Sequence, residues 1–255
     1  MTITVILLVS RTKYLNRVLD SIKAQTLKPQ NILVMFDGHE SDYTLVRNKI
    51  AELDYEATRV YSTYSNKPAD DIFDRRVRIA DIHNLAVKLI EDTDWVWCIE
   101  DDGILEPDAL EKLVDTVERV PNVGMVTGVE LGRHGNPYVG AWKVDNIDEI
   151  KTIESLSNKY HLEVLEEIDA CGLYCALIRA DYYKKHKFIG NNGLGPDVNL
   201  GLFLRKQGFD NYIDWSLGVT HLGVVEHEEV EVKPSDKSTV VKLTHLYGST
   251  WSSGH

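Results

Sequence analysis

A short apolar run that ends in three consecutive acids constrains this chain more than any other feature. Residues 95–99 read Trp-Val-Trp-Cys-Ile, and Glu100, Asp101 and Asp102 follow at once. The run predicts a short buried strand, so the acids lie at its carboxyl end, where open α/β sheets bind their ligands. A helix is predicted next, because apolar residues recur there with helical period: Leu110, Leu113, Val114 and Val117.

Three adjacent carboxylates repel one another unless a cation or solvent neutralises them. In an extended chain Glu100 and Asp102 point to one side and Asp101 to the other. Such a pair can hold a hard divalent ion, whose remaining ligands are water and the phosphate oxygens of a substrate. The alternative is a solvated acidic turn that caps the next helix, and these residues alone leave both interpretations open.

The chain on either side of the acids alternates strands and helices. Strands are predicted at residues 2–9, 32–36, 58–64, 123–128 and 212–215. Amphipathic helices lie between the first three, the second with Ser41 as its N-cap. The polar residues 129–165 read as an irregular insertion. This alternation predicts an α/β fold with a mostly parallel central sheet flanked by helices.

Composition and charge narrow the class of protein. A chain of 255 residues can bury one sizeable core, and its net charge of −12 argues against a broad contact with nucleic acid or an anionic membrane. The three cysteines, Cys98, Cys171 and Cys175, cannot all pair within one chain, and we expect reduced packing residues. The chain has neither a signal-peptide pattern nor the ~18 apolar residues of a membrane-spanning helix, which predicts a cytoplasmic protein.

The stretch from Trp95 to Leu110 resembles the Asp-x-Asp segment of GT-A-fold glycosyltransferases, especially those of family 2. Glu100 stands where that family has its first Asp. Other short matches to the family occur on both sides of this stretch, in the same order as in the family. They are Arg11, Ala24-Gln25-Thr26, Asp37-Gly38, Gly172 and Asp197. The usual Pro-Thr-Tyr-Asn-Arg turn is changed, because residues 7–11 keep only its Arg.

The resemblance covers roughly residues 3–225 and implies one GT-A domain at 1–225 with a Rossmann-like sheet. Within it, residues 1–128 would form the nucleotide-binding half and residues 129–225 the acceptor half. Residues 226–255 would be a tail that folds over the active site. The implied activity is that of a hexosyltransferase-like enzyme. It would move a sugar from a nucleotide-diphosphate donor to an acceptor hydroxyl on a saccharide, a protein or another molecule.

The resemblance also implies the donor site. Asp37 would accept a hydrogen bond from the N3–H of a uracil base, which favours a UDP-sugar, and Arg11 would line the same pocket. Asp101 and Arg78 would contact the donor as well. Arg78 belongs to a cluster of arginines at a helix start, and such cations oppose the helix dipole unless an anion lies nearby. The alternatives are a plain Asp-Gly turn at Asp37 and a solvated basic face around Arg78.

A metal site and a catalytic base complete what the resemblance implies. Glu100, Asp102 and His221 would hold Mn²⁺ or Mg²⁺ together with the donor diphosphate. Asp197 matches the second acid of the family's Glu-Asp pair, which is the base of inverting enzymes, while Pro196 replaces the Glu. The alternative for Asp197 is a carboxylate that only caps its helix.

Two other functions remain open on the sequence. A sugar-nucleotide pyrophosphorylase has a similar nucleotide-binding architecture, but it needs a glycine-rich loop after the first strand, and residues 7–12 contain no Gly. A non-catalytic carbohydrate- or nucleotide-binding module of the same fold would account for the altered first turn and for Pro196. In the helix before the acids, Asn84 is expected to be structural and His83 stays unassigned.

Overall fold

The computed structural model describes residues 1–53, 55, 57–63, 72–130, 138–157, 164–222, 231–232 and 241–242. The helices of this part are α1 (Leu15–Lys23), η1 (Glu40–Asp42), α2 (Tyr43–Ala51), α3 (Ile72–Leu89), α4 (Ala109–Arg119), α5 (Ala180–Lys185) and α6 (Pro196–Lys206). None of these described helices is both long and apolar enough to cross a membrane.

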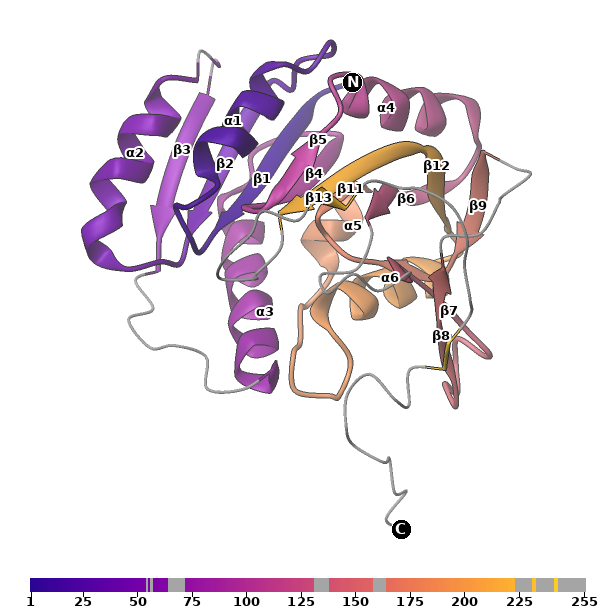
Figure 1. Ribbon diagram of the computed structural model, residues 1–255. Helices are drawn as coiled ribbons and strands as arrows, with labels where there is room; N and C mark the ends of the chain where they lie inside the picture. Colours follow the sequence, from indigo (N-terminus) through magenta and orange to yellow (C-terminus); the bar gives the residue numbers. More distant parts are fainter. Residues whose placement is uncertain are drawn as a thin grey trace.

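The described strands form a large curled sheet and a smaller one (Figure 1). The large sheet contains β1 (Ile3–Val9), β2 (Asn31–Phe36), β3 (Ala57–Ser62), β4 (Trp95–Glu100), β5 (Gly103–Leu105), β6 (Val123–Glu130), β9 (Leu165–Ile168), β11 (Cys175–Arg179), β12 (Asp210–Leu222) and β13 (Glu231–Val232). The small sheet contains β7 (Tyr138–Val144), β8 (Ile153–Ser157), β10 (Ala170–Cys171) and β14 (Val241–Lys242).

The first four strands confirm the predicted parallel α/β framework. β1 pairs in parallel with both β2 and β4, and β3 extends the sheet beyond β2. In this register Val9 lies opposite Phe36, and Leu8 lies opposite Glu100. The carboxyl ends of β1, β2 and β4 therefore lie side by side at one edge of the sheet, as open α/β folds require of a ligand site.

The other half of the sheet brings a distant segment to the same edge. β11 runs antiparallel between β4 and β6, and β12 runs parallel to β6. The end of β12 pairs with the short β5, where His221 lies opposite Gly103. The Leu222 amide also donates to the Asp102 carbonyl at 2.8 Å. The acids that follow β4 are thus placed beside His221, which is far away in the sequence.

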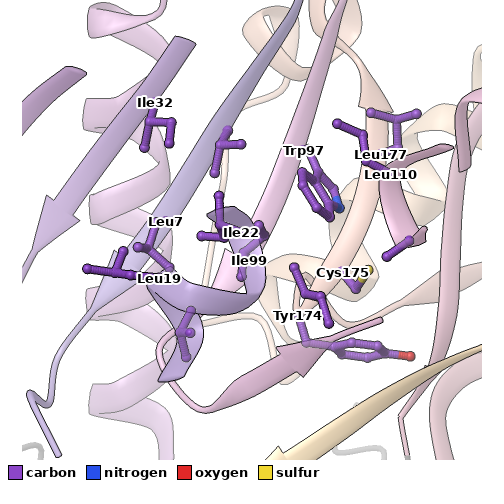
Figure 2. Packing of buried hydrophobic residues seen from close by; sticks show 14 of the residues in the cluster. Leu7, Leu19, Ile22, Ile32, Trp97, Ile99, Leu110, Tyr174, Cys175 and Leu177 are labelled. Carbon is purple, nitrogen blue, oxygen red and sulfur yellow. The ribbon is translucent and has the colours of Figure 1, made fainter. Parts of the chain in front are cut away.

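Both faces of the central strands are covered, which explains their near-continuous apolar sequences. On one face Leu7 and Ile99 pack against α1, α2 and α4, and Figure 2 shows Leu19 and Ile22 of α1 over this cluster, with Trp97 nearby. On the other face Ile6 and its neighbours pack against α3, α5 and α6. The site edge is therefore supported by two hydrophobic cores rather than by loops alone.

Four sequence predictions need correction. The strand predicted at 58–64 ends at Ser62. The predicted N-cap at Ser41 was wrong, because Ser41 lies inside η1 and donates its amide to the His39 side chain. The described parts of the predicted irregular insertion form β7 and β8 as an antiparallel pair, and the strand predicted at 212–215 spans Asp210–Leu222. Apart from β13 and β14, the predicted tail lies outside the described residues.

The cysteines and Asn84 have the structural roles that were expected of them. All three cysteines are free and buried, and burial is the main cause that raises the pKa of Cys175 to about 12 and the pKa of Cys98 and Cys171 above the ordinary value. They are packing residues and not thiolate nucleophiles. The Asn84 side chain bonds both backbone groups of Phe188.

His83, unassigned on the sequence, is a core residue of α3. It is 1% exposed, its Nδ1 lies 2.6 Å from the Tyr183 hydroxyl, and its ring stacks on Phe188 with 4.8 Å between centroids. Burial, with a smaller contribution from the charge of His186, lowers the His83 pKa to about 3. At neutral pH this imidazole is therefore uncharged and serves the packing of α3 on α5.

His83 should make the stability of the protein depend on pH. Its pKa rises from about 3 in the folded protein to about 6.5 in the unfolded chain, so between these values only the unfolded chain takes up a proton. Stability is retained above pH 6.5 and falls toward pH 3, at up to ~1.4 kcal/mol per pH unit from this residue. Urea denaturation at pH 7 and pH 5 measures how much of the free energy of unfolding is lost on acidification. We expect this loss to be smaller for His83→Gln than for wild type. His39→Gln, at an exposed position, is the control and should lose as much unfolding free energy between pH 7 and pH 5 as wild type does. An equal loss in all three proteins would contradict the role of His83.

Candidate active site

The first turn of the chain is held by the carboxylate of Asp101. Oδ2 of Asp101 accepts hydrogen bonds from the Ser10 amide (2.7 Å), the Arg11 amide (2.7 Å) and the Ser10 hydroxyl (3.0 Å). The acid is 4% exposed, so these charge-assisted bonds form largely out of water. Because β1 and β4 are neighbours in the sheet, this carboxylate fixes the end of one strand against the end of the other.

The Arg11 side chain bridges two of the predicted acids. Its guanidinium lies 3.1 Å from Oδ1 of Asp101 and also donates to Oδ2 of Asp102. Burial alone would lower the Arg11 pKa, but the two carboxylates outweigh it and raise that pKa. The structure thus brings together three of the predicted site residues, with the guanidinium of Arg11 between the carboxylates of Asp101 and Asp102.

Asp102 connects this group to His221. Nε2 of His221 lies 3.3 Å from Oδ2 of Asp102 and 3.8 Å from Oε1 of Glu130. All three side chains are buried, with His221 2% exposed. Nε2 of His221 makes no hydrogen bond within the described part of the chain, because its approach to Asp102 lacks hydrogen-bond geometry. The imidazole is therefore held among carboxylates without donating to them.

These donors fit a metal that is shared with a substrate. Imidazole and carboxylate groups are the ligands that Mn²⁺ accepts in proteins, and carboxylates also suit Mg²⁺. Over the residues that the structure describes, no group of three or more His, Cys, Asp or Glu side chains is arranged to hold an ion by itself. A divalent ion held by Asp102 and His221 would need oxygens from a bound diphosphate to complete its coordination.

Glu100 is placed differently from the other acids. The extended conformation that would align Glu100 with Asp102 was a wrong prediction, because β4 ends at Glu100 and residues 101–102 form a turn into β5. Glu100 stays half-buried, and its charge acts on Cys98, which belongs to the core that α3 covers. Asp102 instead contacts Arg11 and lies against His221. The metal role of Glu100 remains a prediction.

Asp37 and Arg78 form the second pair that the structure brings together. Oδ2 of Asp37 accepts from Nη2 (2.5 Å) and Nε (3.2 Å) of Arg78, and Oδ1 accepts from the Thr63 hydroxyl at 2.5 Å. The carboxylate is buried at the carboxyl end of β2. The next residue, Gly38, is closely packed, because a Cβ at this position would lie 2.5 Å from the Phe36 ring. The orientation of the Asp37 carboxylate is therefore fixed from both sides.

Asp197 begins the helix α6, as predicted. Gly195 is the N-cap, Pro196 is the first helical residue, and Asp197 is the acid of the first turn. A Cβ on Gly195 would lie 2.1 Å from Oδ1 of Asp197, so a side chain at this position would displace the carboxylate. The residue is half-buried, and α6 packs on β10, since a Cβ on Gly201 would lie 2.6 Å from Cα of Ala170. Asp197 thus belongs to the part of the site built by α6 and the small sheet.

The sequence analysis missed three residues of this site. Ser10 and Thr63 are short hydroxyl residues that bind Asp101 and Asp37, and such partners are settled by tertiary contacts. Glu130 left a readable signal, because it ends an apolar run at 123–129 just as Glu100 ends the run at 95–99. That strand was predicted to end at residue 128, which left the acid outside it.

Residues 3–229 match the model of a protein family described as glycosyltransferase like family 2. The chain belongs to this family. Family membership decides for a transferase and against the pyrophosphorylase. No curated protein matches the sequence significantly.

Solved structures with the same architecture support the GT-A fold of this glycosyltransferase. They include the mannosyltransferase PcManGT from Pyrobaculum calidifontis in complex with GDP-Man and Mn²⁺ (TM-score 0.55, 14% identity, 89% of this chain and 58% of that one). GalNAc-T7 with UDP, GalNAc and Mn²⁺ has a TM-score of 0.60 at 10% identity and covers 88% of this chain. A197 from STIV has a TM-score of 0.53 at 14% identity and matches over its full length. This chain spans only 44% of GalNAc-T7.

Removing the Asp101 carboxylate should destabilise the fold. Asp101→Ala would leave the amides of Ser10 and Arg11 without their acceptor and take one partner from the Arg11 ion pairs. Loss of hydrogen bonds to a charged acceptor typically costs about 1–3 kcal/mol. Asp115→Ala, which removes an exposed carboxylate paired with Arg119 on α4, should change stability by no more than about 0.5 kcal/mol. Urea denaturation measures both, and equal effects would contradict the structural role of Asp101.

Proposed function

We propose that this glycosyltransferase moves a sugar with inversion from a nucleotide-diphosphate donor, preferably a UDP-sugar, to an acceptor hydroxyl, and that a divalent metal assists. The observation that carries the proposal is the grouping of Arg11, Asp101, Asp102 and His221 at the carboxyl edge of the sheet, next to Asp37. Cations and carboxylates that converge at this edge suit a ligand that carries both a nucleobase and a diphosphate.

Asp37 is the group that would recognise the base. Arg78 and Thr63 hold its two oxygens in a fixed orientation, and an ionised carboxylate is the kind of acceptor that the N3–H of uracil requires. The guanine base offers an N1–H in a similar way, so GDP-sugars rank second. PcManGT was solved with GDP-Man, and TarS from S. aureus with UDP-GlcNAc. Arg78 would act by orienting Asp37, since its guanidinium is bonded to that carboxylate.

Arg11, Asp102 and His221 would bind the diphosphate end of the donor. Arg11 carries several donors in a planar fork that matches phosphate oxygens, and Asp101 fixes the turn that presents it. Asp102 and His221 would hold Mn²⁺ or Mg²⁺, which would stabilise the charge that develops on the leaving diphosphate. On β4 the side chain of Glu100 follows that of Cys98 on the face that α3 covers, so Glu100 would reach such an ion through water. These side chains keep the donor diphosphate fixed while the sugar is transferred.

Asp197 would remove the proton from the acceptor. Its place in the first turn of α6 favours the ionised carboxylate through the helix dipole, so the group can accept a proton at neutral pH. The acceptor oxygen then attacks the anomeric carbon from the face opposite the diphosphate, which inverts the configuration. The acceptor itself stays general: a hydroxyl on a saccharide, a protein or another molecule.

Donor and metal binding can be tested together by thermal shift. UDP-GlcNAc, UDP-glucose, GDP-Man and a CMP-sugar should be screened with Mn²⁺ and with EDTA. A bound ligand stabilises by mass action, about 2.7 kcal/mol at a hundred times its Kd. We expect the largest shift for a UDP-sugar with Mn²⁺, and we expect it to disappear in EDTA and in Asp37→Asn. A shift with the CMP-sugar and none with UDP-sugars would sink the role of Asp37, and full binding in EDTA would sink the metal.

Asp197→Asn tests the mechanism. The amide keeps the size of the side chain and a capping oxygen but cannot take the proton, so turnover should fall by ~10²–10⁴-fold while donor and metal still bind. Asp181→Asn is the matched control, because Asp181 is an exposed acid in the first turn of α5. Product analysis should show an inverted anomeric centre. A variant within a few fold of wild type, or a product with retained configuration, would defeat the assignment.

A further inference from the structure

Helix α3 holds the loop that leads to Asp197. Nη1 of Arg76 donates to the Gly193 carbonyl at 2.9 Å. About two turns further along, the Asn84 side chain bonds both the carbonyl (2.9 Å) and the amide (3.0 Å) of Phe188. Gly190 packs directly on the helix backbone, since a Cβ there would lie 2.3 Å from the Arg76 carbonyl. Figure 1 shows this loop, between α5 and α6, running alongside α3.

The loop is in turn braced to the first turn of α6. The Asn199 side chain donates to the carbonyls of Ile189 (3.2 Å) and Gly195 (3.0 Å) and to Oδ1 of Asn192 (3.1 Å). The Asn192 side chain returns a bond to Asn199 at 2.9 Å. Residues 188–195 and the helix start are therefore one connected unit. A displacement at Gly193 would be passed to Asp197, which is four residues later.

The same helix also holds the donor side of the site. Arg78, two residues after Arg76, bonds Asp37 through Nε and Nη2. Successive residues of an α-helix are turned by about 100°, so Arg76 and Arg78 leave α3 in nearly opposite directions. One arginine reaches the carboxylate at the end of β2, and the other reaches the loop before α6. The start of α3 therefore lies between the two carboxylates that the proposed reaction uses.

We infer that Arg76 is a positioning residue for Asp197, and that the first half of α3 sets where Asp197 lies relative to the donor-binding Asp37. This inference rests on the proposed function. A base acts only within hydrogen-bond reach of the proton it takes, and a misplacement of 1 Å can lower the rate by about a hundredfold. Loosening the loop should therefore lower kcat. The donor KM should stay near wild type, because Arg76 bonds the loop before α6, whereas Asp37 is held by Arg78.

The experiment compares Arg76→Ala with Arg75→Ala and Arg76→Lys in the full chain. Arg75 is the matched control, because it is the same residue type on the same helix and is exposed. Hydrogen exchange of the 188–199 segment and release of UDP from UDP-GlcNAc with Mn²⁺ are the two readouts. We expect Arg76→Ala to exchange faster in this segment and to lose about 10- to 100-fold in kcat with donor KM within about twofold. Arg76→Lys keeps a hydrogen-bond donor at this position, so it should restore part of the exchange protection and part of kcat.

The outcomes separate this inference from the proposed function. Exchange and kcat of Arg76→Ala equal to those of Arg75→Ala would overturn it, and so would a loss carried entirely by donor KM. Arg78→Ala should show the opposite pattern, a raised donor KM, because it releases Asp37. If Asp197→Asn is as active as wild type, the proposed base is wrong, while unchanged exchange in Arg76→Ala would show separately that Arg76 does not hold the loop.

Discussion

The hydrogen bonds from the Ser10–Arg11 turn to Asp101 are the interaction on which the rest of the site depends. They exist because β1 and β4 are adjacent and in register, so the turn after one strand meets the acids after the other. Once the turn is fixed, Arg11 reaches Asp102. The backbone of Asp102 then anchors the end of β12, and so His221 is brought beside its carboxylate. One buried carboxylate thus organises groups from three separate parts of the sequence.

This arrangement gathers negative charge in a dry place. Asp101, Asp102 and Glu130 are buried, and Arg11 is the guanidinium that pairs with the first two of them. Taking carboxylates out of water is unfavourable unless positive charge compensates. A divalent cation beside Asp102 would supply such charge. The electrostatics of this edge therefore support the metal that we propose.

The sequence was a good guide to elements whose signal is local. Apolar periodicity was enough to predict β1 to β4, the helices between them and the helix whose first turn contains Asp197. It failed where the chain leaves regular geometry. Strand alternation predicted Glu100 and Asp102 on one side of an extended chain, but residues 101–102 form a turn, so the alternation does not extend to them. Contacts between distant segments are not visible as a pattern in a single sequence. They include the hydrogen bond from Ser10 to Asp101, the bond from the Thr63 hydroxyl to Asp37 and the pairing of β7 with β8.

The donor and acceptor halves proposed for this glycosyltransferase are not separate folding units. β11 comes from the second half of the chain, yet it lies between β4 and β6 from the first half. Its alternate side chains pack into both hydrophobic cores, Cys175 and Leu177 on one face and Ala176 and Ile178 on the other. A chain cut after β6 would therefore leave β4 and β6 without the strand that joins them. Helix α6, which carries the proposed base Asp197, packs on a face of the same sheet whose edge carries the proposed donor site. The separation of the two proposed sites is therefore set by the packing of the sheet and its helices.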